Sequence, residues 1–162
     1  MSERTEFGFE RTHCDCRECQ INCRFMPGFL IPADLDRMIP ANADPYNWAE
    51  KNLLASPGAV VMNTATGETS RIYTLVPAVK KDGSCINLKD GLCTIHETAP
   101  FGCAFFDCGP ERENLSRKGL WEVWKAWQED GLYARLWKYL QAQKFTQKAP
   151  EVLRARMREA EA

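Results

Sequence analysis

Residues 85–108 read CINLKDGLCTIHETAPFGCAFFDC, and their four cysteines have the spacing C-x7-C-x9-C-x4-C. A second stretch of this kind, residues 13–31, reads HCDCRECQINCRFMPGFLI and has the spacing C-x-C-x2-C-x3-C. Residues 13–31 and 96–110 lack the helical or strand period that buries one face of an element. Because such segments gain order from ligation rather than from packing, these two stretches decide the fold.

The two stretches contain all eight cysteines of the 162-residue chain. Thiolates are soft ligands that suit Zn(II), Cu(I) and iron–sulfur clusters and bind Mg or Ca poorly. Short gaps let neighbouring thiolates converge on one centre at a small cost in loop closure. We therefore predict two tetra-thiolate metal sites, or one shared site with spare thiols. The predicted metal ligands are Cys14, Cys16, Cys19, Cys23, Cys85, Cys93, Cys103 and Cys108.

The spacing leaves the identity of the metal open, because C-x2-C occurs in zinc knuckles and in iron–sulfur sites alike. The order C-x2-C-x3-C is the reverse of the radical-SAM arrangement, so that chemistry is not indicated. No cysteine stands in the C-P-x-C-G form common in zinc knuckles, which favours an iron–sulfur cluster or iron over zinc. A disulfide framework is the alternative, but it is typical of exported chains, and the start MSERTEFGFE has no apolar leader.

The charge balance argues against nucleic acid and membrane partners. Lys and Arg number 21 against 22 Asp and Glu, so the formal net charge is -1. There is no basic excess to bind polyanions, and no run of about 18 apolar residues that could span a bilayer. We expect one cytoplasmic domain, residues 1–162, with a cysteine-cluster core at 13–110 and a helical extension at 111–162.

Outside the cysteine stretches, the sequence predicts a small α+β fold. Short helices are expected over residues 32–39 and 45–56, each opened by a proline. Segments rich in β-branched and apolar residues are expected to form a small antiparallel β-meander. In this meander, the turn at 89–91 would place Cys85 and Cys93 on adjacent strands and on one face. The predicted strands cover residues 59–63, 70–79, 85–88 and 92–95.

The C-terminal part of the sequence predicts amphipathic helices. Apolar residues recur at spacings of three and four over residues 116–145, where Gly131 could kink or split the helix. Pro150 is expected to open a last, highly charged helix. A row of tryptophans at helical spacing predicts a core-facing stripe, with a partner-binding face or a cover over a cluster as alternatives. These tryptophans are Trp121, Trp124, Trp127 and Trp137.

Residues 93–108 resemble the signature C-x-I-Y-x-x-R-P-x-x-C-R-x-F-P-C of the zinc- or iron-chelating CxxCxxCC (YkgJ-like) cysteine-cluster family. Residues 83–93, GSCINLKDGLC, are similar to the family's G-x-C-x-x-L…G-x-C approach. Near the N-terminus, a run of cysteines precedes Pro27-Gly28 as CxxCxxCC precedes its Pro-Gly turn, so the resemblance covers residues 13–110. The matching positions are Cys16, Cys19, Cys23, Cys93, Ile95, Pro100, Cys103, Phe106 and Cys108.

The chain departs from the family pattern at several positions. Asn22 replaces the third cysteine of CxxCxxCC, and Cys14 is additional. Either Cys14 restores the missing thiolate, or Asn22 leaves an open coordination position. His96 replaces the signature tyrosine, and it and His13 are further candidate ligands. The two arginines and the last proline of the signature are replaced by Ala99, Ala104 and Asp107.

The resemblance implies metal chelation, with zinc or iron undecided. A similar cysteine segment occurs in flagellin lysine N-methylases, where an iron–sulfur cluster is implied. Because the chain has no dinucleotide, Walker, H-E-x-x-H or G-x-S-x-G motif, no catalytic residue is indicated. We expect a cysteine-cluster metalloprotein that binds metal ions and acts in redox, metal handling or modification of a protein or peptide partner. The alternatives are a structural zinc-binding interaction module without catalysis and a thiol–disulfide protein.

Overall fold

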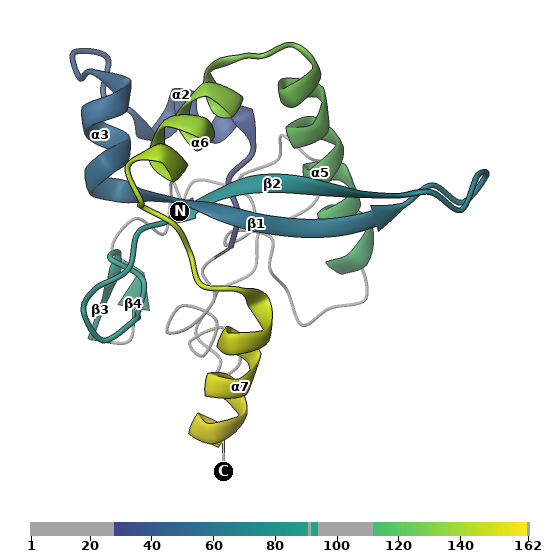
Figure 1. Ribbon diagram of the computed structural model, residues 1–162. Helices are drawn as coiled ribbons and strands as arrows, with labels where there is room; N and C mark the ends of the chain where they lie inside the picture. The colour runs from purple at the N-terminus through teal and green to yellow at the C-terminus, as the bar shows by residue number, and fades with distance from the viewer. Residues whose placement is uncertain (1–27, 91, 94–111, 162) are drawn as a thin grey trace.

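The computed structural model describes residues 28–90, 92–93 and 112–161. Strands and helices follow one another in separate runs, so the predicted α+β class is confirmed (Figure 1). In chain order the elements are α2 (Pro32–Met38), α3 (Pro45–Asn52), β1 (Leu53–Met62), β2 (Thr69–Pro77), β3 (Leu88–Lys89), β4 (Leu92–Cys93), α5 (Arg112–Gln128), α6 (Leu132–Ala142) and α7 (Pro150–Glu161).

Proline begins the first two helices, as the sequence predicts. Pro32 opens α2 and Pro45 opens α3, at a position where a helix needs no amide hydrogen. The carboxylate of Asp44 caps α3 by accepting a 3.3 Å hydrogen bond from the amide of Asn47. Local chain chemistry therefore determines where both helices start.

The predicted end of the second helix, at residue 56, is wrong. α3 ends at Asn52, and Leu53 already pairs with Pro77 in the sheet. Leu53 and Ala55 are both buried in the core, whereas Leu54 between them is half-buried. Residues 53–56 thus gain more from burial of one strand face than from continuing the helix, because tertiary packing overrides a weak helical preference.

β1 and β2 form an antiparallel hairpin whose tip extends beyond the helices (Figure 1). Its register shifts between Ser56 and Ala59, where Pro57-Gly58 forms a bulge. Gly58 has φ +67°, and a Cβ there would lie 1.8 Å from the carbonyl oxygen of Ile72. The Pro-Gly pair, which directly follows the predicted helix end at residue 56, is therefore a bend inside one strand.

β3 and β4 form a second, shorter hairpin in which Leu88 pairs with Cys93 and Lys89 with Leu92. The strands are antiparallel as predicted, but in the described part of the chain they belong to two separate sheets rather than one meander. The reason lies at the outer edge of β2, where the carbonyl of Leu75 accepts a 2.8 Å hydrogen bond from the amide of Leu30. Because residue 30 occupies that edge, the chain after β2 turns away from the sheet.

The core lies between the β1–β2 sheet and the helices α5 and α6. The helical pattern predicted for residues 116–145 is divided at Gly131, which separates α5 from α6, and α7 begins at Pro150 as predicted. The indole of Trp137 donates a 2.9 Å hydrogen bond to the carbonyl of Ser56 and so ties α6 to β1. The residues buried in this core are Leu30, Ile31, Leu35, Ala49, Leu53, Ala55, Ile72, Leu75, Val123, Ala126, Tyr133, Leu136, Trp137 and Leu140.

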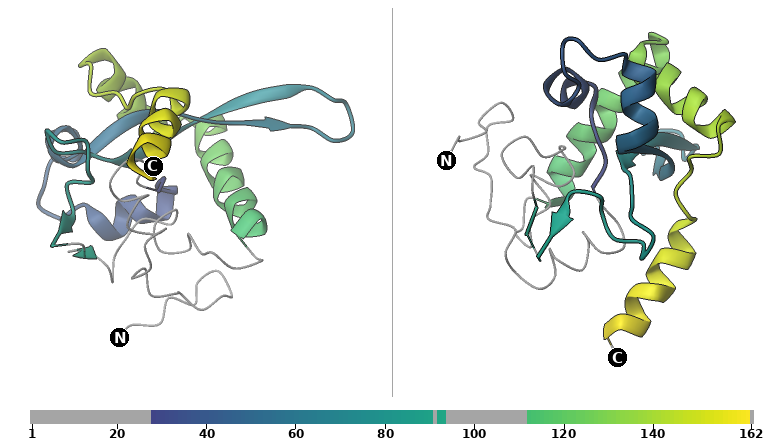
Figure 2. Two further views of the ribbon diagram at one scale, coloured as in Figure 1. Left: turned by 90° about the horizontal axis from the view of Figure 1, so that it is seen from below. Right: turned by 90° about the vertical axis from the view of Figure 1, so that its left-hand side faces the viewer.

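The β1–β2 sheet separates two groups of elements (Figures 1 and 2). α3 and α6 lie on one side of it, above the sheet in Figure 1, whereas α7 and the β3–β4 hairpin lie on the other side. Among the described helices, none combines the length and the hydropathy that crossing a membrane requires.

Candidate functional site

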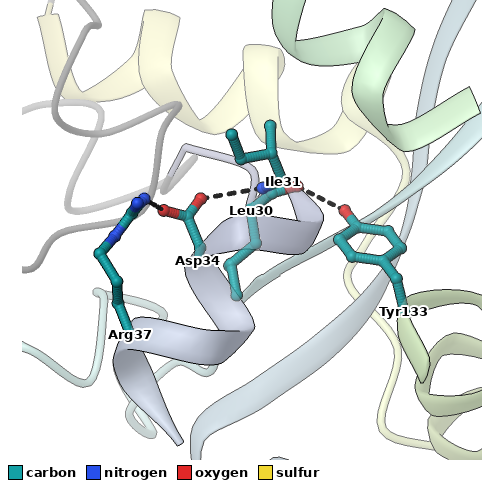
Figure 3. Close-up of polar contacts among 5 residues, drawn as sticks. All are labelled: Leu30, Ile31, Asp34, Arg37 and Tyr133. Atoms are coloured by element: carbon teal, nitrogen blue, oxygen red, sulfur yellow. Dashed lines mark hydrogen bonds and ion pairs between the residues drawn. The ribbon is translucent and has the colours of Figure 1, made fainter. Parts of the chain in front are cut away.

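The segment that follows the first cysteine stretch is anchored to the core by Tyr133. The Tyr133 hydroxyl donates a 2.6 Å hydrogen bond to the carbonyl of Leu30 (Figure 3), and it accepts a 2.8 Å bond from the amide of Leu75. Tyr133 is 1% exposed, and burial raises the pKa of its hydroxyl far above the ordinary value. The chain that leaves the first cysteine stretch is thus fixed against β2 at residue 30.

A buried carboxylate lies directly after this anchor. Asp34 is fully buried, and its Oδ2 accepts a 2.9 Å hydrogen bond from the amide of Ile31. Its other oxygen pairs with the guanidinium of Arg37, whose side chain is 31% exposed (Figure 3). A carboxylate out of water requires such partners, because an unpaired buried charge is costly. Asp34 and Arg37 therefore stabilise the start of α2, beside the segment that leads from the first cysteine stretch.

Cys85 is held at the base of a tight loop that follows β2. Its backbone forms a bridge with Val79, and the amide of Ile86 donates a 2.8 Å hydrogen bond to Ala78. Within the loop, Asp82 accepts hydrogen bonds from the hydroxyl and the amide of Ser84, at 2.6 and 2.9 Å. These bonds hold the pKa of Asp82 below its ordinary value. The Cys85 residue is 5% exposed, so its sulfur belongs to a preformed, largely dry position.

The prediction that Cys85 and Cys93 lie on adjacent strands of one hairpin is wrong. Cys93 lies opposite Leu88 in the β3–β4 hairpin, and Cys85 lies opposite Val79 in a different bridge. The pairing of Lys89 with Leu92 makes the hairpin tighter than the three-residue turn that the sequence analysis assumed. As a result, Cys85 and Cys93 are not cross-strand neighbours, because each pairs with a different segment.

Most of the predicted ligand set lies outside the described residues. Among residues 28–90, 92–93 and 112–161, no group of three or more His, Cys, Asp or Glu side chains could hold a metal ion. The positions outside the described ranges are Cys14, Cys16, Cys19, Cys23, Cys103, Cys108, His13, His96 and Asn22.

The described ends that flank the two cysteine stretches lie on one side of the β1–β2 sheet. The β3–β4 hairpin and the first turn of α5 lie below the sheet in Figure 1, and the segment that enters α2 rises from that side past the edge of β2. The anchor at Leu30 and the bridge at Cys85 are both connected to β2, through Leu75 and Val79. The fold thus brings the borders of both stretches to the same side of the molecule.

The tryptophan row divides between core and surface. Trp137 is 8% exposed and packs edge-on against Trp127, with ring centroids 5.5 Å apart. Trp121 and Trp124 are 55% and 38% exposed and stack with an interplanar angle of 13°. The core interpretation is therefore correct for Trp127 and Trp137. Trp121 and Trp124 instead form an apolar surface on α5.

Comparison of the chain with protein-family models, with curated proteins and with solved structures gave no match. The site is therefore interpreted from its own residues. Sequence reasoning counted Asp34 only as a first-turn signal for the helix at Pro32 and did not anticipate its burial or the role of Tyr133. An acidic residue in the first turn of a helix marks Asp34 as a capping residue, but no local pattern distinguishes a buried carboxylate from an exposed one.

Proposed function

We propose that this chain is a thiolate-ligated metalloprotein of the YkgJ-like kind, in which the eight cysteines hold an iron–sulfur cluster or iron. The main support is the donor set, because eight thiols in two closely spaced groups match the ligand preference of these metals. An iron–sulfur centre would supply electron transfer or Lewis acidity. The protein would accordingly act in redox, in metal handling or in modification of a protein or peptide.

The arrangement of the described chain supports convergence of the two cysteine groups. Leu30 and Val79 connect the borders of both stretches to β2, and the β3–β4 hairpin and the first turn of α5, which border the second stretch, lie on one side of the sheet (Figure 1). Short connecting distances lower the loop-closure cost of bringing distant thiolates together. The buried Cys85 fits a ligand position, because a dry surrounding protects a thiolate centre from water and oxidants.

Anaerobic purification of the full chain, followed by visible absorption and by iron, sulfide and zinc analysis, tests this proposal. We expect a coloured protein with stoichiometric iron and acid-labile sulfide. The variants Cys103→Ser and Cys85→Ser should each lower the metal content. Ser84→Ala is the matched control, because it perturbs the loop of Cys85 without removing a thiol. Full metal content in both cysteine variants, or a metal-free protein with disulfides in non-reducing mass spectrometry, would overturn the assignment.

A structural zinc module is the second candidate, and one observation favours it. The stacked Trp121 and Trp124 offer an exposed aromatic surface, and tryptophan is enriched among the residues that dominate protein interfaces. In that case the metal analysis yields zinc and a colourless protein. Zinc removal would then unfold residues 13–31 and 85–108, because structural metal binding supplies folding free energy.

A further inference from the structure

A groove lies between the loop after β2 and the start of α7. The loop and the helix run alongside each other in the right-hand view of Figure 2, and the groove between them has a volume of about 210 Å³. The segment after α6 forms its other wall and is held against β1 by two hydrogen bonds. The carbonyl of Phe145 accepts a 2.9 Å bond from the amide of Ala55, and the amide of Gln147 donates a 2.9 Å bond to the carbonyl of Ala55. The lining residues are Leu54, Val79, Lys80, Lys81, Asp82, Gly83, Thr146, Gln147, Lys148, Leu153 and Arg156.

The lining of this basic groove is strongly cationic, although the chain as a whole is nearly neutral. It contains Lys80, Lys81, Lys148 and Arg156 against the single carboxylate of Asp82, so its formal charge is +3 (four positive minus one negative). The chain as a whole has a net charge of -1. Three separate segments contribute these cations, and tertiary folding therefore concentrates charge that the sequence leaves dispersed.

The carboxylate in the groove does not neutralise the cations by ion pairing. Asp82 accepts hydrogen bonds from the hydroxyl and the amide of its neighbour Ser84. Within the described residues, neither Lys81 nor Lys148 forms an ion pair with a carboxylate. Neighbouring positive charges such as those of Lys81 and Lys148 repel one another, and an anionic ligand relieves that repulsion.

Two of the cations are positioned by the backbone of the loop. The guanidinium of Arg156 donates a 3.3 Å hydrogen bond to the carbonyl of Asp82. It also lies so close to Gly83 that a Cβ there would come within 2.7 Å of Nη2. Lys80 donates through its ammonium to the carbonyl of Leu88. Because these contacts orient the two side chains before any ligand arrives, binding would cost less side-chain entropy.

We propose that the basic groove binds a small-molecule oxyanion, a phosphate or carboxylate group carried on a short apolar body. Guanidinium and ammonium groups recognise such oxygens through charge-assisted hydrogen bonds. The apolar side chains of Leu54, Val79 and Leu153 line the same space and suit a short carbon stem. At about 210 Å³ the groove is smaller than the roughly 300–1,000 Å³ of sites for drug-sized ligands, which favours a small anion over a whole nucleotide.

Isothermal titration of the full chain with inorganic phosphate, and separately with succinate, at fixed ionic strength tests this proposal. We expect saturable binding of at least one probe, and the tighter probe identifies the oxyanion. Lys148→Glu should weaken binding at least tenfold, whereas Lys51→Glu, on α3, changes the net charge equally and should leave it unchanged. If Lys148→Glu does not fold, Arg156→Gln replaces it as the groove variant. Arg158→Gln, on the same helix α7 but outside the groove, is then its control.

Equal affinities in groove and control variants, or no saturable binding of either probe, would refute the proposed groove site. The outcome is independent of the metal proposal, because metal content is measured on the same samples. Loss of anion binding in Lys148→Glu with unchanged metal content assigns the effect to the groove. If phosphate binds only while metal is present and the groove variants bind it normally, the anion occupies the metal centre and the groove proposal fails.

Discussion

The hydroxyl of Tyr133 donates a 2.6 Å hydrogen bond to the carbonyl of Leu30, across 103 positions of sequence. The same hydroxyl accepts from the amide of Leu75, so one oxygen connects α6, β2 and the segment that leaves the first cysteine stretch. Leu30 is fully buried, and its backbone polar groups have no access to water there. Tyr133 thus satisfies groups whose burial would otherwise be costly.

Tyr133→Phe removes this connection while keeping the ring. We expect the free energy of unfolding to fall by about 1–3 kcal/mol, because a buried carbonyl and a buried amide each lose a partner. Urea denaturation followed by circular dichroism measures the change. Tyr73→Phe is the matched control, since Tyr73 is 38% exposed and no hydrogen bond of its hydroxyl joins it to the described residues. Equal losses in the two variants would contradict the anchoring role.

Alkaline pH should destabilise the protein through Tyr133. Burial raises the pKa of this hydroxyl above its ordinary value, so the folded chain keeps a proton that the unfolded chain releases above about pH 10. The associated stability is complete below that pH and falls above it by about 1.4 kcal/mol per pH unit. Unfolding free energies measured between pH 9 and about pH 11 should decline less steeply in Tyr133→Phe than in Tyr73→Phe.

Asp34→Asn should destabilise α2 and the segment before it. The substitution removes the charge from a fully buried group that accepts hydrogen bonds from Arg37 and from the amide of Ile31, and weakening such bonds costs about 1–3 kcal/mol. Asp36→Asn, on the same helix but exposed, should change stability by less than about 0.5 kcal/mol. Thermal and urea unfolding of both variants give the comparison. A small effect at position 34 would mean that the carboxylate is not required at its buried position.

Gly58→Ala should be far more disruptive than Gly67→Ala. Both glycines have positive φ, +67° and +72°, but only at position 58 would a Cβ meet the backbone, 1.8 Å from the carbonyl oxygen of Ile72. We expect a loss of about 3 kcal/mol or more at position 58, from clash and strain together. At position 67 only the strain of about 1 kcal/mol remains. Similar unfolding midpoints for the two variants would rule out the bulge geometry.

Removal of metal by a chelator should leave the described core folded. Among the described residues, the buried core cluster contains no cysteine, so its packing does not depend directly on ligation. Hydrogen exchange followed by mass spectrometry should show faster exchange confined to residues 13–27 and 85–108, with Leu30, β1, β2 and α6 still protected. Collapse of protection throughout the molecule would show that metal ligation and core packing form one cooperative unit.

Several elements could be predicted because their causes are local. Pro32, Pro45 and Pro150 begin helices where the sequence analysis placed the starts, and Gly131 divides α5 from α6. Proline presets φ and lacks an amide hydrogen, and glycine weakens a helix, whatever the rest of the chain does. The thiolate donor set also follows from residue type and spacing alone, and it remains a prediction.

The errors arose where distant segments compete for the same residues. Residues 53–56 fit a helix locally, yet they pair with β2 because that buries Leu53 and Ala55. Cys85 was expected on the strand next to that of Cys93, but it pairs with Val79, since Leu30 occupies the outer edge of β2 and turns the chain away. Neither choice is visible in a window of a few residues, because each depends on long-range burial and hydrogen bonding.

The amino-acid sequence by itself determined the kind of chemistry available and the starts of the helices, because side-chain softness, proline and glycine act within a few residues. Only the tertiary structure decided that Asp34 is buried, that Tyr133 reaches Leu30 and that four dispersed cations share one groove. Those relationships join segments separated by many residues. They form only where the burial of apolar surface compensates for the entropy lost in closing the chain between them.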